Sequence, residues 1–327
     1  MSAHSFELMS PSDGSKQSRE RRKGLGLTVM VALFATMETA STSFATTSAV
    51  SPYTVNVVQC AAGAVTLLLV AASRGQQLYV HQDVFGICMQ FGISFWFFLW
   101  GYVKALVFLQ VVDLTAISVG VSPIVSTVVG CVLLGEAFSA YKVFVLLRNI
   151  AVVAIILGCP KADDEASILQ GIIWGVVMCI GTAFMRTSQR KIPKTPAATT
   201  TFYGYALNTL LWLPPGAFRC RIPFLWPTEL QDEISDHAHP WPVWLAVALG
   251  GILGALLVAL QGVVLVYLDV GTYSMWVSPL YLMLSTVWQG FASGATLPRR
   301  ALAGVFLQVV GSVIDFWLDQ RINIGAH

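Results

Sequence analysis

Charged residues are scarce in this chain of 327 residues, because Asp, Glu, Lys and Arg together make up only 11% of it. An average soluble domain carries about a quarter of its residues as charged side chains. Apolar residues account for 56% of the chain, and the mean hydropathy is +0.70. The scarcity of charge therefore excludes an ordinary soluble domain and predicts an integral membrane protein.

Patterns that hold metals or support hydrolysis are also missing. The six cysteines form no CxxC pair, no HExxH run occurs, and all five histidines fall outside the long apolar runs. A membrane-embedded hydrolase needs a nucleophile with its base, or a metal cluster, at membrane depth. We therefore expect no enzyme, no metal site and no cofactor. The net charge of +2 provides no field that would attract nucleic acid.

Long apolar runs bounded by charge, proline or glycine are what the chain has instead. A membrane-spanning helix needs about 20 such residues, so the length of the chain suits about ten helices. The predicted fold is an all-α polytopic membrane protein. The expected spans are 25–45, 53–73, 84–103, 114–134, 142–158, 168–185, 197–218, 243–267, 272–291 and 301–318.

Lys and Arg are unevenly distributed between alternate loops. If the amino terminus is cytosolic, twelve basic residues fall on the inner side and six on the outer side, while Arg148 lies within the fifth span. Cytosolic loops carry the excess of Lys and Arg, so both termini are expected in the cytosol. Residues 1–24 are predicted to be a disordered basic cytosolic tail, and 321–327 the cytosolic carboxyl terminus. The inner set is Lys16, Arg19, Arg21, Arg22, Lys23, Arg74, Lys142, Arg186, Arg190, Lys191, Lys194 and Arg321.

An internal repeat relates the two halves of the chain. The runs DLTAISVGVSP at 113–123 and DVGTYSMWVSP at 269–279 match at five of eleven positions, with a constant shift of 156 residues. Each run opens the fourth helix of a five-helix half, which gives repeats at 25–159 and 168–320 joined by a linker at 160–167. Because each half has an odd number of spans, the halves are expected to face opposite ways, as in secondary transporters.

The passage ISVGVSPIVSTVVGCVLLGE, which ends at Glu136, is followed by a short polar turn and an apolar run to Gly158. This layout resembles the end of an EamA-type half from the drug/metabolite transporter superfamily. The second half has the same layout at 273–294 and 301–311. The resemblance covers nearly all of the chain after residue 24, through loose motifs of small and apolar residues. Among eukaryotic relatives the chain is similar to the solute-carrier 35 group, and the resemblance implies ten helices and transport of a metabolite.

Polar groups at membrane depth are the candidates for contact with a solute. An ionised group there costs roughly 2.5 to 3.5 kcal/mol, so each needs a reason to be present. Glu38 lies within the first span, with Ser41 and Thr42 on the same helical face. Glu38 is interpreted either as a proton-coupling acid or partner of a cationic group, or as a protonated acid bonded to neighbouring hydroxyls.

Prolines occupy matching positions in the two repeats, at Ser122-Pro123 and Ser278-Pro279. A proline inside a helix removes a backbone donor and frees carbonyls that can face a cavity. Aromatic and amide side chains supplement this set, although aromatic residues at helical spacing also serve as packing. The candidate solute contacts are Glu38, Thr42, Trp96, Trp100, Ser122, Pro123, Gln261, Tyr273, Trp276, Ser278 and Pro279.

Other charged residues favour structural roles. Arg148 in the fifth span and Asp315 in the tenth are predicted to form an ion pair, because the resemblance implies that these two helices are neighbours. The alternatives are that Arg148 binds substrate or phosphate, or that its side chain extends to the membrane interface. Asp113 and Asp269 each precede an apolar helix and are predicted to cap it. The repeat symmetry would put these two carboxylates on opposite faces of the membrane.

The sequence thus predicts a secondary transporter that moves a small polar metabolite by alternating access, with the solute between the first, third, fourth, eighth and ninth helices. One alternative is an exchanger of nucleotide sugars or organic phosphates in the endomembrane system. Another is a receptor or regulator that kept the fold without transport. The expected partners are a small-molecule substrate and the lipid bilayer, with a homodimer left open. The plasma membrane and Golgi-type membranes both stay open as locations.

Overall fold

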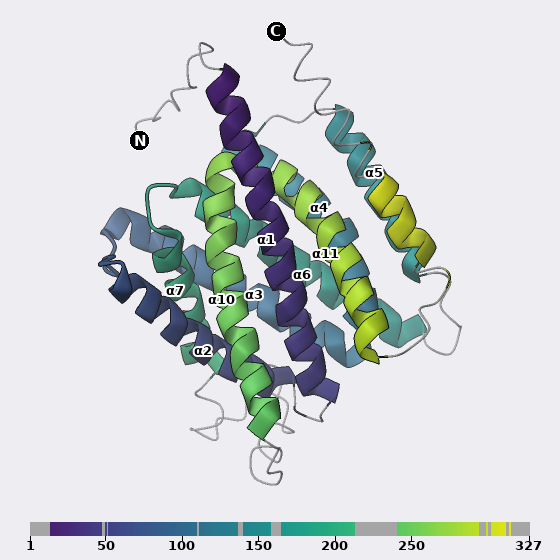
Figure 1. Ribbon diagram of the computed structural model, residues 1–327, viewed down its shortest axis with the longest axis horizontal. Helices are drawn as coiled ribbons and strands as arrows, with labels where there is room; N and C mark the ends of the chain where they lie inside the picture. The colour runs from purple at the N-terminus through teal and green to yellow at the C-terminus, as the bar shows by residue number, and fades with distance from the viewer. Residues whose placement is uncertain are drawn as a thin grey trace.

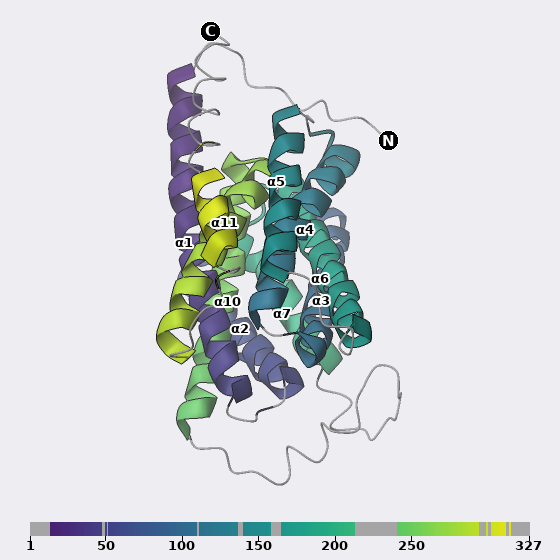
Figure 2. The same cartoon turned by 90° about the vertical axis from the view of Figure 1, so that its right-hand side faces the viewer.

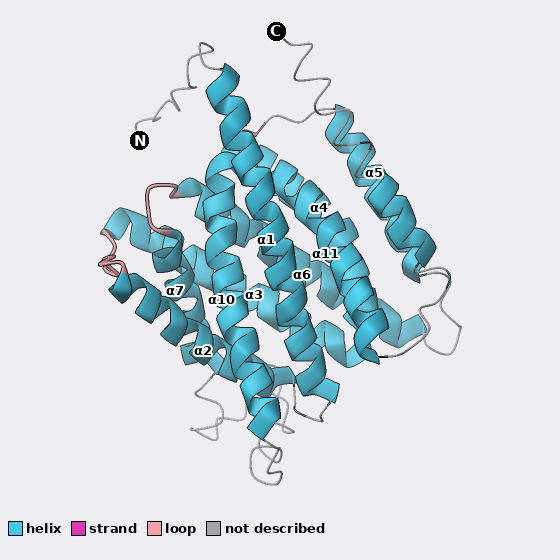
Figure 3. Ribbon diagram, viewed as in Figure 1, coloured by secondary structure: helices cyan, strands magenta, loops and turns pink. Residues whose placement is uncertain are grey.

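The structure, a computed structural model, describes residues 14–47, 50, 52–109, 111–136, 140–157, 165–212, 241–293, 299, 302–311 and 314. Within these ranges the regular secondary structure is entirely helical (Figure 3). The helices are α1 (Gly14–Thr47), α2 (Pro52–Ser73), α3 (Gln82–Phe108), α4 (Val111–Leu134), α5 (Ala140–Leu157), α6 (Glu165–Lys191), α7 (Ala197–Trp212), α10 (Trp241–Tyr267) and α11 (Val270–Ser293), with a further helical segment at Leu302–Gly311.

Two glycines in the left-handed conformation end helices α2 and α4. Gly75 has φ of 59° and Gly135 has φ of 67°, values that side chains with a Cβ rarely adopt. After α2, the amide of Gln76 donates to the carbonyl of Ala71 at 2.9 Å, which satisfies one of the last helical carbonyls. These glycines explain why the apolar runs stop where the sequence predicts an end.

Helix α1 is longer than the apolar run that it contains. It begins at Gly14, so residues 14–24, expected from the sequence to be disordered, are helical. The segment is rich in Lys, Gln, Arg and Glu, which all have high helix propensity, and it continues directly into the apolar helix. Figure 1 shows this amino-terminal part of α1 extending beyond the neighbouring helices.

Six helices of the described ranges are long and apolar enough to cross a membrane. They contain the segments Arg19–Thr42, Thr54–Ser73, Gln82–Phe108, Asp113–Leu134, Ile168–Lys191 and Trp241–Tyr267. Large apolar side chains lie on the outside of the bundle, among them Leu69, Val132 and Leu147, with 64%, 76% and 61% of their surface exposed. Apolar exposure on this scale suits lipid rather than water. The protein is therefore a helical integral membrane protein.

Helices from both ends of the chain pack together in one bundle (Figures 1 and 2). Helix α1 packs on α10 and α11, while α6 packs on α3 and α4. Helix α2 contacts α7 and α10, and α7 also contacts α3. Helix α5 packs on α4, and Gln308 of the segment Leu302–Gly311 donates a hydrogen bond to Asn149 of α5 at 3.0 Å.

Glycines allow the closest helix contacts. A Cβ on Gly251 of α10 would clash with the backbone of Gln59 in α2, and a Cβ on Gly101 of α3 would lie 2.6 Å from the amide of Met178 in α6. A Cβ on Gly181 of α6 would in turn lie 2.5 Å from the amide of Phe98. Small residues at such contacts let backbones pack directly in membrane proteins. The spacing of Gly250, Gly251, Gly254 and Ala255 serves this purpose on α10.

Replacing Gly251 with alanine is therefore expected to destabilise the protein. The added methyl group meets the α2 backbone, which cannot rotate away, so the cost is about 1 to 3 kcal/mol. The melting temperature of the detergent-solubilised protein measures this effect. Gly26→Ala is the matched control, because nothing lies within 4 Å of its new Cβ and alanine favours a helix. Equal melting temperatures for both variants would show that α2 and α10 can move apart with little loss of stability.

Candidate functional site

A cavity of about 150 Å³ lies inside the bundle. Its wall comes from α1, α2, α3, α4, α6, α7, α10 and α11, so helices from both ends of the chain enclose it. The expected enclosing helices all contribute, and α2, α6 and α7 contribute as well. Its polar lining residues are Glu38, Thr39, Asn56, Gln59, Tyr102, Thr115, Ser118, Thr182, Arg186, Tyr205, Gln261, Tyr273, Ser278 and Tyr281.

Glu38 is the acidic group of the cavity wall. It lies on α1 opposite Gly254 of α10, where an added Cβ would come within 3.4 Å of the Glu38 side chain. Beside it, the hydroxyls of Thr39 and Tyr281 share a hydrogen bond of 2.6 Å, which ties α1 to α11. The absence of a side chain at Gly254 leaves room around the carboxyl group. Glu38 can therefore contact a solute or exchange a proton within the cavity.

Arg186 is the basic group of the cavity wall, and only 8% of its surface is exposed. Its Nη1 donates to the hydroxyls of Ser122 at 3.0 Å, Ser126 at 3.3 Å and Ser274 at 2.7 Å. The guanidinium carbon lies 5.0 Å from the ring centre of Tyr273, within the range of a cation–π contact. Serine hydroxyls of α4 and α11 therefore accept hydrogen bonds from the guanidinium of this α6 residue.

A chain of amide hydrogen bonds lies beside the Arg186 cluster. Gln189 donates to the carbonyl of Val258 at 3.0 Å and accepts from Gln261 Nε2 at 3.0 Å. The hydroxyl of Tyr273 donates to Gln261 Oε1 at 3.2 Å. This network fixes the Tyr273 ring under the guanidinium. It also joins α6, α10 and α11 at one level of the bundle.

The acidic and basic groups lie at different depths of the cavity. On α11, Ser274 contacts Arg186 while Tyr281 contacts the residue next to Glu38. Seven helical residues correspond to about 10 Å of axial rise, so the two groups are separated by roughly that distance along the bundle. The cavity is thus polarised, with a carboxyl group towards one end and a guanidinium towards the other.

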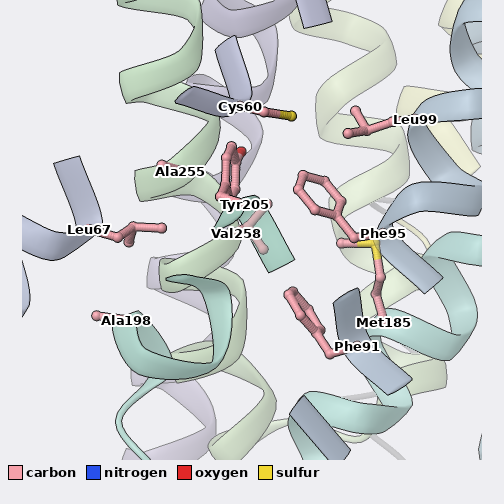
Figure 4. Packing of buried hydrophobic residues seen from close by; sticks show 10 residues of the cluster. All are labelled: Cys60, Leu67, Phe91, Phe95, Leu99, Met185, Ala198, Tyr205, Ala255 and Val258. Carbon is pink, nitrogen blue, oxygen red and sulfur yellow. The ribbon is translucent and has the colours of Figure 1, made fainter. Parts of the chain in front are cut away.

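Aromatic side chains of α3 and α7 form one wall of the cavity. Figure 4 shows two of them, Phe95 and Tyr205, packed side by side. Their ring centres are 4.8 Å apart, and the Phe98 ring lies 5.9 Å from Phe95. The expected aromatic contacts, Trp96 and Trp100, do not line the cavity. They stack on each other at 5.2 Å on another face of α3, where Trp100 meets Trp174. Spacing put Trp96 and Trp100 on a common face, but it did not identify which face points inward.

The remaining candidate contacts divide into three groups. Glu38, Gln261, Tyr273 and Ser278 line the cavity. Thr42 and Ser122 lie behind the wall, where Thr42 accepts a hydrogen bond of 3.0 Å from the lining residue Gln59 and Ser122 accepts one from Arg186. Pro123 and Pro279 lie within α4 and α11 and are buried, and Trp276 is half-buried, but none of these three lines the cavity.

Arg148 lies on α5 against the last described helical segment. Its Nη2 donates to Asn149 Oδ1 at 3.3 Å, and the guanidinium lies where a Cβ on Gly311 would be. The predicted partner Asp315 lies outside the described residues. Helix α5 thus contacts the segment Leu302–Gly311, and Arg148 does not line the cavity.

Asp269 and Asp113 differ in their positions relative to their helices. Asp269 precedes α11 and accepts hydrogen bonds from the amide of Thr272 at 2.7 Å and from its hydroxyl at 2.6 Å, which is the geometry of an N-cap. Asp113 lies in the first turn of α4 rather than before it, because the helix begins at Val111. A carboxylate there still complements the helix dipole.

Polar contacts join the α4–α5 connection to the start of α11. Lys142 Nζ lies 3.2 Å from Asp269 Oδ1, and the amide of Val270 donates to Glu136 Oε1 at 3.0 Å. Burial alone would raise the pKa of Asp269, but Lys142 and Thr272 together outweigh it and hold the pKa below its usual value. Burial, and to a lesser extent Asp269, raises the pKa of Glu136.

Arg186 is the functional candidate that sequence reasoning missed. It was counted among the basic residues of an inner loop because Arg190 and Lys191 follow it closely. Helix α6 continues to Lys191, so Arg186 lies well inside the helix, on its buried face. The hydroxyls of Thr187 and Ser188 beside it were the available signal. Among the described residues, no group of three or more His, Cys, Asp and Glu side chains could hold a metal ion.

Comparison with known proteins supports the fold. No family model and no curated protein matches the chain. A solved structure described only as "Crystal structure of protein" superposes on 90% of this chain and on 98% of its own chain, with a TM-score of 0.65 and 16% sequence identity. At this identity the likeness concerns the fold alone.

Two substitutions at Asp269 are expected to separate its cap from its ion pair. Asn retains the ability to cap, so Asp269→Asn should lose at most about 1 kcal/mol, from the Lys142 pair. Asp269→Ala should lose about 1 kcal/mol more, from the cap. Thermal unfolding in detergent measures both changes.

The ion-pair contribution should also depend on pH. The folded-state pKa of Asp269 is lower than the reference value of 3.8. The stabilisation is therefore fully present above that pH and is lost as the pH falls through the folded-state value. The difference between the wild type and Asp269→Asn should shrink in that acidic range. A difference that stayed constant with pH would contradict the assignment.

Proposed function

We propose that this protein is a secondary transporter that moves a small polar metabolite by alternating access. The observation that carries the proposal is the polarised cavity, enclosed by helices of membrane-spanning length and lined by both Glu38 and Arg186. Ionisable groups inside a membrane protein are costly, and they commonly mark the path of a solute or proton. Transporters hold their solutes between helices at mid-depth, and this cavity lies between helices of membrane-spanning length.

An inverted repeat of two five-helix halves is part of the proposal. Helices α1 to α5 would form one half, and α6, α7, α10, α11 and the segment Leu302–Gly311 the other. The equivalent pairs would be α1 with α6, α2 with α7, α3 with α10, and α4 with α11. Exchanging these helices converts the α1–α10 contact into α6–α3, the α1–α11 contact into α6–α4, and the α2–α10 contact into α7–α3. All of these contacts occur, and the α2–α7 and α4–α11 contacts map onto themselves. This pairing supports a twofold relation between the halves.

The positions of the repeated aspartates support opposite orientations. Asp269 contacts Lys142, the third residue of α5, and lies beside the end of α4 through the Glu136–Val270 bond. Asp113 lies in the first turn of α4, at the opposite end of this helix of 24 residues. Together with the excess of Lys and Arg in alternate loops, this arrangement favours both termini in the cytosol, with Asp269 on the cytosolic side.

Labelling from one side of the membrane tests this topology. Single cysteines at Val107, near the start of α4, and at Tyr267, near Asp269, are introduced into a cysteine-free chain. Both native side chains are exposed, at 60% and 37%. A membrane-impermeant maleimide is expected to label only the Val107 position in intact cells, and the Tyr267 position only after permeabilisation. Labelling of both from the same side would contradict the inverted repeat.

Polar contacts lie between the cavity and the proposed cytosolic side. Arg190 of α6 donates to the carbonyls of Leu265 and Val266 in α10, the second at 3.1 Å. A second pocket of about 300 Å³ lies beyond Gln189 and is lined by Lys194, Gly262 and neighbouring residues. Because Gln189 also bonds the lining residue Gln261, the amide network separates the two spaces. Alternating access would require these contacts to open.

Counterflow in proteoliposomes tests transport directly. Vesicles that contain the purified protein are preloaded with unlabelled amino acids, organic acids, amines or sugar phosphates, and uptake of the matching labelled solute is followed. Accumulation above protein-free vesicles is expected for at least one class. A solute that binds the protein but is never moved would favour the receptor alternative.

Glu38 is expected to couple transport to protons. Glu38→Gln should reduce uptake driven by a pH gradient to the background level while leaving counterflow intact, because glutamine retains the shape but cannot exchange a proton. Glu20→Gln, on the same helix but outside the cavity, is the matched control and should retain both activities. If the Glu38→Gln variant keeps its pH dependence, the coupling role is wrong.

A further inference from the structure

We infer that Arg186 binds an anionic group of the transported solute, so that the substrate class is an organic anion carrying a carboxylate or phosphate. This inference rests on the proposed transport function and specifies its substrate. It starts from the charge of Arg186, which is buried in the protein and lines the cavity.

The described residues provide no counter-ion for this charge. The polar partners of Arg186 are three neutral serine hydroxyls and the Tyr273 ring, and no described carboxylate lies within 4 Å of the guanidinium. An arginine stays protonated at any physiological pH, so burial does not remove its charge. Burying an unpaired charge is costly, and the cost falls when an anion binds beside it.

The hydrogen-bonding geometry leaves one edge of the guanidinium without a partner among the described residues, and Nε on this edge is buried. All three serine contacts use Nη1. Nε has no hydrogen-bond partner among the described residues, and Nη2 donates to none of them. The Nε–Nη2 edge presents two parallel donors, the arrangement that binds carboxylate or phosphate oxygens in a bidentate manner. The serines therefore position the group, and binding of an anion would supply the partners that its other edge lacks.

The surroundings of Arg186 favour an anion over a neutral polar group. Ser274 donates its own proton to the carbonyl of Val270 at 2.7 Å, which orients its oxygen as an acceptor for Arg186. Tyr273 is fixed by Gln261 and covers the guanidinium with its ring. Glu38 lies about 10 Å away along the bundle, too far to neutralise Arg186 directly. A solute with its anionic group on Arg186 would extend from there towards Glu38.

Matched pairs of ligands test this inference by thermal shift of the purified full-length protein. The pairs are glutarate with glutaramide, glucose 6-phosphate with glucose, and uridine 5′-monophosphate with uridine, at constant ionic strength. The anionic member of at least one pair should raise the melting temperature, while its neutral partner should not. The responding pair distinguishes a carboxylate from a phosphate. Equal stabilisation by both members, or no response to any pair, overturns the inference.

Variants then locate the site. Arg186→Gln should weaken binding of the responding anion by at least about 30-fold, as expected when a desolvated charge partner is removed. Arg186→Lys keeps the charge but lacks the fork, so it should bind with intermediate affinity. Lys191→Gln removes an equal charge from an exposed position of the same helix and should bind as the wild type does. Unchanged binding by both Arg186 variants overturns the inference.

Two further readouts distinguish an anion site from a purely structural role of Arg186. If Arg186 only anchored α4 and α11, Arg186→Gln would lower the melting temperature of the unliganded protein and leave affinity intact, which would overturn the inference. Binding is measured without a membrane, so its failure is distinct from a failure of transport. Counterflow of a neutral solute that is unaffected by Arg186→Gln would overturn the anion site and leave the transporter proposal standing.

Discussion

The cost of holding charge inside a membrane protein is the constraint on which the arrangement of this molecule depends. Arg186 and Glu38 both lie within membrane-length helices, and both line the same cavity. Hydroxyls from α4 and α11 meet one end of the guanidinium, and a glycine of α10 leaves space beside the carboxyl group. The two ionisable groups thus account for the serines, the amide network and the glycine that surround them.

Backbone packing makes such a cavity compatible with a stable bundle. Little hydrophobic driving force exists between helices in lipid, so close contact and interhelical hydrogen bonds must stabilise the assembly. Gly251 and Gly101 allow α10 to meet α2 and α3 to meet α6 without intervening side chains. The aromatic wall of Phe95, Phe98 and Tyr205 then fills the space between these contacts. The space that these side chains do not occupy is the cavity, which the polar groups line.

Much of the fold could be predicted from composition and the lengths of apolar runs, because lipid leaves few alternatives to helices. The site was only partly predictable. Glu38 was predictable because an acid interrupts an apolar run, Ser278 because it precedes a proline inside a helix, and Tyr273 as an aromatic residue near that proline. Trp96 and Trp100 do not line the cavity, because helical spacing defines a face but not its direction. Arg186 was missed because basic residues at the end of a span resemble those of a loop.

The glycine contacts also constrain how the protein can change shape. Gly251 joins α10 to α2, and Gly101 and Gly181 join α3 to α6, and each pair takes one helix from either side of the chain's midpoint. Because their backbones meet directly, we expect the two helices of each pair to move as one unit. Under the proposed repeat, the units that move would therefore be the α2–α10 and α3–α6 pairs, each with one helix from either half, rather than the two halves themselves. Any conformational change would then occur at the side-chain contacts between these pairs.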